Sequence, residues 1–351
     1  MIIEFSVKNF RSIRDLQTLS FKATGLKSPS EFQQLDIDNI ISNRDESTLK
    51  TIGIYGANAS GKSNIVFAFQ HFIEVIRNEP SQIPNLSGVC DPFLYQEDAE
   101  VSESFFQVVM YINNKKFRYG FTVNKDKSLI TPENPNGETI TSEWLYGTKD
   151  HNMTEYFLRK GGEIRKTKNI DFEKIPEIPY SHTLFLTHAA AFDNAGVCAS
   201  IRHFFKARAI SNLNDEWETF RWNSVIALEI ENRKQELLDF LSHFNLKYSD
   251  VEILREGNNR EPSVPPYEKI TFTKDYWINH KKKSLKLNLK NNESSGTQKL
   301  FDLAGLILRA FTFGYNGLII IDEIDSNFHP SLLIKIINLF NSKEHNKSDV
   351  Q

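Results

Sequence analysis

The sequence has few cysteines, no long apolar run and no excess of charge of one sign. Its two cysteines, Cys90 and Cys198, are too few for a disulfide framework and lack the spacing of a metal site. No apolar run approaches the roughly 18 residues of a transmembrane helix, and the first residues lack the basic and apolar blocks of a signal peptide. These absences predict a soluble cytoplasmic protein with no membrane partner.

The overall charge says nothing in favour of a nucleic-acid partner. Lys and Arg number 42 against 45 Asp and Glu, for a net charge of −3, so a DNA-binding face would have to be a local patch. Hydrophobic residues make up 40% of the chain and include 27 Phe, which is ample for a core. At 351 residues the chain predicts one large α/β core with an insertion, or two lobes.

A strand-like stretch at 51–55, a glycine-rich loop and a helical pattern over 64–76 follow one another. The loop reads GANASGKS and fills the pattern G-x-x-x-x-G-K-[ST] in full. Its glycines let the backbone approach phosphates, and the N–H groups at the helix start favour an anion. Lys62 would contact the β- and γ-phosphates, and the Ser63 hydroxyl can ligate Mg²⁺. The predicted nucleotide-binding residues are Gly56, Ala57, Asn58, Ala59, Ser60, Gly61, Lys62, Ser63 and Asn64.

An acidic pair follows four apolar residues, Leu318–Ile321. Such a run predicts a central strand buried on both faces, with the acids at its C-terminal end, where ligands of open α/β sheets bind. Asp322 would hold Mg²⁺ through water, and Glu323 would polarise the attacking water. The alternative is a core strand whose acidic residues cap the next helix.

A polar stretch of small residues, ESSGTQK at 293–299, opens an apolar helix expected over 297–313. Ser294 or Ser295 could be an ordinary N-cap. A Ser-Gly helix start is also an anion site, and the phosphate-binding loop of this chain does not need a second one.

Together the motifs resemble ABC-type ATPases of the RecF, SMC and OLD class. The likeness is closest to the RloA- and AbiL-type ATPases of phage defence and to the ATPase of PARIS-like systems. The shared features are the sequence NFRS at 9–12 in an N-terminal strand, the GANASGKSN loop, the SSGTQKL signature and the segment IDEIDSNFHP. The resemblance covers both ends of the chain well and the middle loosely. It implies an α/β P-loop NTPase fold with an ABC-type ATPase head, an N-terminal antiparallel β lobe and a helical insertion.

The resemblance also implies a head-to-tail homodimer in which the signature of one chain contacts ATP on the other. It assigns Lys62 and Glu323 to catalysis, Ser63 and Asp322 to Mg²⁺, and Ser295, Gly296, Gln298, Asp325, Arg11 and Ser12 to the nucleotide. Gln96 stands where a Q-loop would fall, although a lone Gln is more often a surface residue.

One family feature is missing from the expected place. In the family the acidic pair, called Walker B, is followed by a helix and then by a strand that ends in a histidine, which senses the γ-phosphate. Here a polar stretch follows the helix expected at 331–340, His345 lies in that stretch, and His329 belongs to the segment of Asp325. We expect a truncated C-terminus, with residues 350–351 entering a strand; a natural short form with impaired hydrolysis is the alternative. ATP binding is therefore the firmer expectation, and turnover the weaker one.

The remaining segments predict the organisation of the chain. Strands are expected at 2–7, 16–21, 104–111, 116–123, 144–146, 155–158, 183–187, 251–254, 270–277 and 284–289, with a basic turn at 280–283 between the last two. Residues 200–246 are expected to be helical. The predicted domains are 1–190, with the phosphate loop and a β-rich region, 191–250, a helical insertion, and 251–351, with the signature and acidic pair.

Two functions compete. The first is an ATP-driven sensor, regulator or scaffold of a separate effector, a nuclease or toxin, in antiphage defence. The second is a DNA-repair ATPase of RecF type that clamps duplex DNA, for which the candidate basic stripes are Lys115, Lys116, Arg118, Lys125 and Lys127, or Lys281–Lys283. Such charge runs are usually solvated faces. A transporter subunit would leave the N-terminal strand without a role, and a small-molecule kinase would leave the signature without one.

Overall fold

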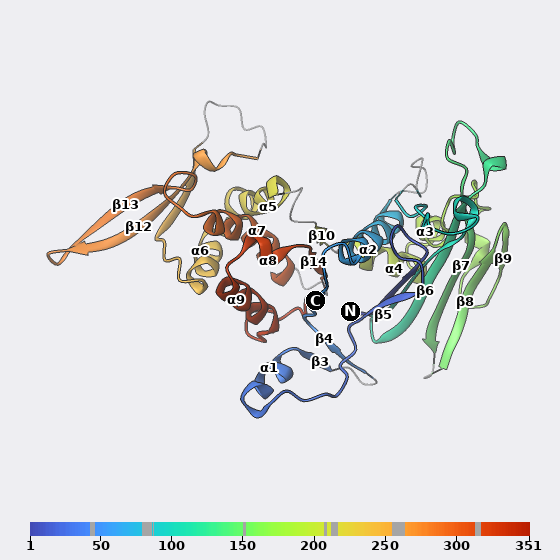
Figure 1. The fold of residues 1–351 in the computed structure, drawn as a ribbon, viewed down its shortest axis with the longest axis horizontal. Helices are drawn as coiled ribbons and strands as arrows, with labels where there is room; N and C mark the ends of the chain where they lie inside the picture. Colours follow the sequence, from blue (N-terminus) through green and yellow to red (C-terminus); the bar gives the residue numbers. More distant parts are fainter. Residues whose placement is uncertain are drawn as a thin grey trace. The chain divides into compact units, whose positions relative to one another are not determined.

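A computed structural model describes residues 1–42, 46–78, 86, 88–149, 152–206, 209–211, 217–254, 264–312 and 317–351 (Figure 1). The chain divides into two compact units, Met1–Ile210 with Gln351, and Ser211–Val350. The three domains predicted from the sequence stay a prediction. The two units divide the predicted helical segment, because α4 (Val197–Lys206) belongs to the first unit and α5 (Trp217–Glu229) to the second.

The first unit contains a seven-stranded antiparallel sheet in the order β2-β1-β5-β6-β7-β8-β9. Its strands are β1 (Ile2–Lys8), β2 (Gln17–Ser20), β5 (Ser104–Ile112), β6 (Lys115–Lys125), β7 (Glu138–Lys149), β8 (Asn152–Lys160) and β9 (Glu163–Arg165). The predicted pairing of the first two strands and the predicted hairpin are confirmed. Asn113 and Asn114 join the hairpin at φ 49° and 62°, the left-handed conformation that a two-residue hairpin turn requires.

Helices and short elements complete the first unit. They are η1 (Ser30–Phe32), α1 (Gln33–Asp38), β3 (Ile40–Ser42), β4 (Ser47–Leu49), α2 (Lys62–Arg77), η2 (Ala99–Val101), η3 (Lys127–Leu129), η4 (Phe172–Lys174), α3 (Phe185–Phe192) and α4. β10 (Ala209–Ser211) follows α4 in the sequence. The structure confirms the helix predicted after the phosphate loop.

Stacked phenylalanines hold α2 on the sheet. Phe5 of β1 stacks on Phe69 of α2 with ring centroids 4.2 Å apart. Phe72, one turn further along α2, stacks on Phe121 of β6 at 5.4 Å. All four rings are fully buried. Because offset stacking adds to the burial of large apolar rings, these contacts fix the rotation of α2 about its own axis.

The strand predicted at 183–187 is wrong, because α3 begins there. The carboxylate of Glu143, on β7, accepts hydrogen bonds from the backbone N–H groups of Phe185 (2.7 Å) and Leu186 (2.9 Å). It also accepts one from the Tyr119 hydroxyl at 3.0 Å, and the Arg159 guanidinium lies 3.8 Å away. A buried acid from a distant strand therefore satisfies the N–H groups of the helix start, which local sequence does not reveal.

The strand predicted at 51–55, before the phosphate loop, is also not present. Ile52 is only half-buried, and Tyr55 is 89% exposed. Gly53 interrupts the apolar alternation, and glycine weakens a strand. Within the described residues this segment has no neighbouring strand to pair with, and a strand without ladder hydrogen bonds is not stable.

The second unit contains helices and a three-stranded antiparallel sheet, β11-β12-β13. Its elements are α5, α6 (Lys234–His243), β11 (Asp250–Ile253), η5 (Tyr267–Lys269), β12 (Ile270–Ile278), β13 (Lys281–Asn288), α7 (Ser295–Thr312), β14 (Ile319–Ile321), α8 (Ile324–Asn327) and α9 (Pro330–Asn341). The predicted strands and most of the predicted helices are confirmed here. Within the segment predicted to be helical, 200–246, the prediction is wrong for residues 209–211, which form β10, and residues 207–208 and 212–216 lie outside the described residues. The predicted basic turn is corrected: Asn279 and His280 make the turn at φ 49° and 60°, and the lysines that follow belong to β13.

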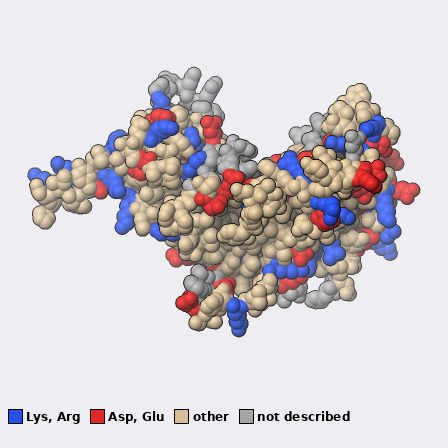
Figure 2. Space-filling view, viewed as in Figure 1, with Lys and Arg blue, Asp and Glu red and all other residues tan. Residues whose placement is uncertain are grey.

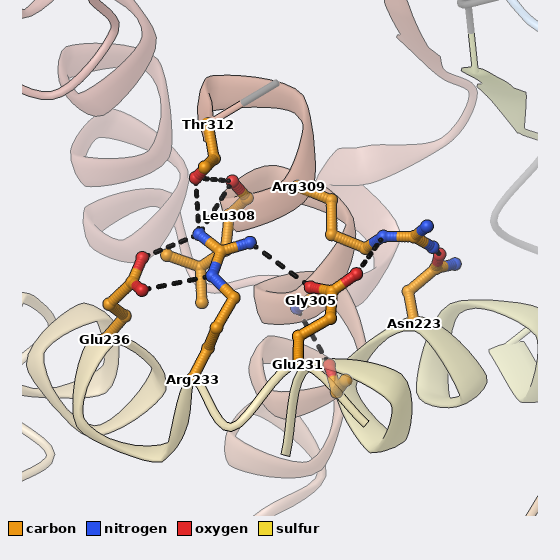
Figure 3. A network of polar contacts seen from close by, with 9 residues as sticks. Asn223, Glu231, Arg233, Glu236, Gly305, Leu308, Arg309 and Thr312 are labelled. Atoms are coloured by element: carbon orange, nitrogen blue, oxygen red, sulfur yellow. Dashed lines mark hydrogen bonds and ion pairs between the residues drawn. The ribbon is translucent and has the colours of Figure 1, made fainter. Parts of the chain in front are cut away.

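Helices α5 and α7 touch at Gly305. A Cβ on this glycine would lie 2.2 Å from the backbone nitrogen of Ser224, so only glycine allows this approach. The Ser224 hydroxyl accepts a hydrogen bond from the Gly305 N–H at 2.8 Å. Figure 3 shows the neighbouring network, in which Arg233 binds Glu236 at 2.6 Å, Glu231 at 3.4 Å and the Leu308 carbonyl at 3.2 Å. The C-terminal half of α7 is thereby tied to α5 and α6.

Two further expectations for the C-terminal part are corrected. Residues 319–321 of β14 are half-buried instead of buried on both faces, because β14 is not part of the three-stranded sheet of its unit. Residues 350–351 are buried but are not in a strand. Among the described residues, no helix has both the length and the apolar character needed to cross a bilayer.

We predict that Glu143→Ala destabilises the first unit by about 3–5 kcal/mol, because it leaves Arg159 buried without its acid and the start of α3 without acceptors. The measurement is the urea midpoint, followed by tryptophan fluorescence. Glu163→Ala, at an exposed position of β9, is the matched control and should stay within about 0.5 kcal/mol of wild type. Equal midpoints for the two variants would contradict the structural role of Glu143.

Candidate nucleotide-binding site

The loop before α2 presents backbone donors that have no acceptor. Gly61 caps α2 at φ 92°, a left-handed conformation in which a side chain would be strained. Among the described residues, the N–H groups of Gly61, Lys62 and Ser63 donate no hydrogen bond. These groups lie at the start of a 16-residue helix, where the helix dipole favours an anion. The loop therefore has the donors that a phosphate needs.

Two side chains of the loop, those of Lys62 and Ser63, suit a nucleoside triphosphate and its metal ion. The Lys62 ammonium donates to the carbonyls of Gly56 (2.7 Å) and Ala57 (2.9 Å), so it is folded over the loop. A Cβ at Gly56 would lie 2.7 Å from the Ser60 hydroxyl, so a side chain at this position would require Ser60 to move. Within the described part of the chain the Ser63 hydroxyl has no hydrogen-bond partner, so it is available as a ligand for Mg²⁺.

The turn at residues 9–12 lies against the beginning of α2. The amide of Asn64 donates to the Ser12 hydroxyl at 2.6 Å. The Arg11 guanidinium binds Asp91 at 2.9 Å and lies 4.9 Å from the centre of the Phe67 ring of α2. The structure thus brings Arg11 and Ser12 close to the phosphate loop, and their role toward a nucleotide stays a prediction.

Asn9, the first residue of the NFRS sequence, was given no role of its own from the sequence, and it organises this turn. Asn9 is buried, with φ 54°, and its side-chain oxygen accepts from the Gln96 amide at 2.7 Å and the Phe93 N–H at 3.0 Å. Its amide nitrogen donates to the Ser102 hydroxyl at 2.8 Å. Gln96, the suggested Q-loop residue, is therefore tied to the turn. The signal in the sequence was the Asn at the end of an apolar alternation, a residue type that tolerates the left-handed conformation.

In the second unit, the signature stretch forms the start of α7. The Ser294 hydroxyl accepts from the Thr297 N–H at 3.2 Å, so the ordinary cap is Ser294. Ser295 is exposed. Gln298 donates from its amide to the Leu289 carbonyl at 3.0 Å and so ties the preceding turn to the helix. A Cβ placed on Gly296 would make only ordinary van der Waals contacts, with Leu332 and Ser294 at 3.8 Å.

The acidic pair follows β14 directly. Asp322 accepts a hydrogen bond from the Glu323 N–H at 3.0 Å. Glu323 is exposed at φ 51° and stands at the N-cap of α8, but its side chain makes no capping hydrogen bond. Asp325 is exposed in the first turn of α8. His329 caps α9, where its Nδ1 accepts from the Ser331 N–H at 3.3 Å. The Glu323 side chain therefore does not cap the next helix, as the alternative interpretation of the acidic pair had it.

A buried ionic cluster lies further along α7. The Asp302 carboxylate accepts from the Tyr267 hydroxyl and from Arg221 at 3.2 Å, and the Arg221 guanidinium lies 3.7 Å from the centre of the Tyr267 ring. Burial raises the pKa of Asp302 to about 7, although its hydrogen bonds act in the opposite direction. Burial also lowers the pKa of Lys299 to about 8. The sequence analysis missed this cluster; its signal was one acid within an apolar helix pattern.

The predicted site residues thus form two sets, one in each compact unit. Gly56–Asn64 with Arg11 and Ser12 belong to the first unit, and Ser295–Gln298 with Asp322–Asp325 belong to the second. Within the described residues, no group of three or more His, Cys, Asp or Glu side chains could hold a metal ion by itself.

A family model matches residues 52–351, which include the phosphate loop, the signature stretch and the acidic pair. The family is described as "AAA domain, putative AbiEii toxin, Type IV TA system". The chain belongs to this family. No curated protein matches the chain.

Family membership makes the chain a P-loop ATPase of the ABC-like class, and it implies binding of a nucleotide with a divalent metal. The loop at 56–63 fits that implication through its N–H groups, Lys62 and Ser63. The mixed α/β content and the large antiparallel sheet agree with this class. The finer likeness to RloA- and AbiL-type ATPases stays a prediction.

Lys62→Ala should weaken ATP binding by at least about tenfold, because it removes the charged donor to the phosphates, a contact worth about 1.5–3 kcal/mol. Calorimetric titration with ATP in the presence of Mg²⁺ measures the loss. Lys27→Ala removes one exposed lysine of the same unit and should leave the affinity unchanged. Unchanged affinity in Lys62→Ala would refute the assignment of the loop.

Proposed function

We propose that two copies of this chain close around ATP and Mg²⁺, and that the closed dimer is a switch that controls a separate effector in antiphage defence. The effector would be a nuclease or a toxin. The observation that carries the proposal is that the chain has two helix starts built for anions, one at α2 and one at α7.

The start of α7 is suited to the phosphates of another chain. Among the described residues, the N–H groups of Ser295 and Gly296 donate no hydrogen bond, and the Ser295 side chain is exposed. Helix α7 has 18 residues, so its dipole adds to the field at these groups. Since the loop at 56–63 already provides the donors for one triphosphate, the natural ligand of a second anion site is the ATP of a partner.

The remaining residues take roles that follow from their chemistry. Ser63 and Asp322 would hold the metal, which when bound neutralises charge on the phosphate oxygens. Glu323 is exposed and carries a carboxylate that can orient a water molecule. Lys62 would leave the carbonyls of Gly56 and Ala57 and turn to the phosphates. Asp325 would contact the nucleotide, and so would the turn that contains Arg11 and Ser12.

The defence role rests on two supports. The family description refers to a putative toxin and to a type IV TA system. The motifs resemble those of phage-defence ATPases. The motifs in these residues are those of an ATPase head, and the proposal therefore assigns the effector activity to another chain.

The second candidate, a RecF-type ATPase that clamps DNA, receives no support from the first basic stripe. Lys116 binds Glu46 at 2.5 Å. Lys115 and Lys125 lie at opposite ends of β6, roughly 33 Å apart along an extended strand. These residues therefore do not make one continuous patch.

Glu323→Gln should trap the ATP-bound dimer, because the amide preserves the shape of the side chain but cannot polarise water. The expected result in size-exclusion chromatography with light scattering is a dimer at saturating ATP and a monomer without it. A variant that stays monomeric at saturating ATP would count heavily against closure around the nucleotide.

Ser295→Arg should block this dimer while leaving one-chain ATP binding intact, because the long cation would fill the approach to the start of α7. The same scattering measurement, made in the Glu323→Gln background, tests it, and calorimetry checks ATP binding. Gln235→Arg, which adds the same charge on an exposed face of α6, is the matched control and should still dimerise. Dimerisation by both variants would show that Ser295 is only part of a helix start.

A further inference from the structure

The distal parts of β12 and β13 form a two-stranded ribbon that extends from the rest of their unit (Figure 1). β11 pairs only with residues 270–273 of β12. Beyond that point, and among the residues that the structure describes, residues 274–278 pair with residues 281–285 and with no third strand. The ribbon is about 14 Å long from Lys274 to Ile278, at the usual rise of an extended strand.

The two faces of this ribbon differ in chemistry. Residues directly opposite each other in an antiparallel pair share one face. The pairs Lys274 with Leu285, Tyr276 with Lys283, and Ile278 with Lys281 therefore alternate with Asp275 with Ser284, and Trp277 with Lys282. We call the first set the basic face; its members are Lys274, Tyr276, Ile278, Lys281, Lys283 and Leu285.

Lysines on the two faces differ in their partners. On the opposite face, Lys282 binds Asp275 at 2.8 Å, and Lys286 binds Glu252 at 2.7 Å. The three lysines of the basic face have no acidic partner within the described part of the chain. The basic face itself carries no carboxylate. Figure 2 shows the Lys and Arg atoms, in blue, along this ribbon.

The same face exposes apolar groups between its lysines. Tyr276 is 39% exposed, Ile278 46% and Leu285 51%. Apolar side chains that alternate with unpaired cations on a projecting element are poorly explained by solubility alone, because lysines by themselves would suffice. They suit a partner that presents negative charge and flat or methyl-bearing groups together.

We propose that the basic face docks into the major groove of double-stranded DNA. That groove is about 12 Å wide and admits a two-stranded β-ribbon. Lys274, Lys281 and Lys283 contact phosphates, while Tyr276 and Ile278 face the base edges. The deep, narrow major groove of duplex RNA does not admit such a ribbon. This DNA contact does not depend on the ATP site and is tested without nucleotide.

The test measures the affinity of the full chain for a labelled DNA duplex by fluorescence anisotropy. It compares two double variants, both with substitutions in β13. Lys281→Ala with Lys283→Ala removes two charges from the basic face. Lys282→Ala with Lys286→Ala removes two from the opposite face, so the net charge is the same. We expect the first pair to weaken binding at least tenfold and to reduce the slope of log affinity against log salt by about 2 between roughly 0.05 and 0.2 M salt. The second pair should change the affinity less than threefold.

A second comparison tests the apolar contact. Tyr276→Ala should weaken binding to duplex DNA severalfold, and Trp277→Ala, on the opposite face, should not. Circular dichroism of each variant confirms the fold, and repeating the titration in Lys62→Ala separates DNA binding from the ATP site.

Several results would overturn the proposal. No binding by wild type at the lowest salt would end it. Equal losses in the two double variants would show a general charge effect instead of a specific face. Displacement of the DNA by polyglutamate at equal charge concentration, or equal binding of duplex RNA, would assign the face to acidic proteins or to polyanions in general.

Discussion

The stacked phenylalanines between the sheet and α2 set the position of the phosphate loop. A loop has few contacts of its own, so its geometry follows from the element that it precedes. Phe5 and Phe121 hold Phe69 and Phe72 by ring stacking, and all are buried. The N–H groups of Gly61, Lys62 and Ser63, which donate no hydrogen bond among the described residues, lie at the start of α2, so the position of this helix sets theirs. A large antiparallel sheet is thus a rigid base for a site that lies outside it.

In the second unit a helix is also held in position, by close packing and ion pairs instead of ring stacking. Helix α7 is fixed by the close approach at Gly305 and by the Arg233 network near its C-terminal end. Asp302, buried beside Arg221, holds its middle. At the start of the helix Ser295 remains exposed. A helix anchored from its middle to its C-terminal end can present its first residues to a partner without moving when that partner binds, which lowers the entropy cost of association.

Much of the local structure follows from the sequence, and the exceptions have physical reasons. The period of apolar residues predicts α2, α7 and α9, and the Asn113-Asn114 pair predicts the hairpin, because these signals are local. The stretch at 183–187 misleads because Glu143, about 40 residues earlier, provides the acceptors that start α3. The stretch at 51–55 misleads because apolar composition does not supply a pairing partner.

Within the candidate site, motif residues can be found from spacing, whereas supporting residues cannot. The spacing of Gly56 to Ser63 follows from phosphate chemistry and is therefore legible in the chain. Asn9 and Asp302 act through partners that are distant in sequence, such as Gln96 and Arg221. Which face of β13 carries the lysines that have no acidic partner in the described part of the chain depends on register, since a shift by one residue would exchange the two faces.

The Lys62 ammonium, held by two carbonyls of its own loop, has a consequence for the heat of nucleotide binding. The loop uses its own oxygens as temporary acceptors for this ammonium, so at the Lys62 side chain a phosphate exchanges one set of hydrogen bonds for another, whereas at the N–H groups of the loop it forms new ones. The enthalpy released at the Lys62 side chain is therefore only the difference between the two sets of bonds. Water and counterions freed from the phosphates then contribute a larger share of the affinity, as a gain in entropy.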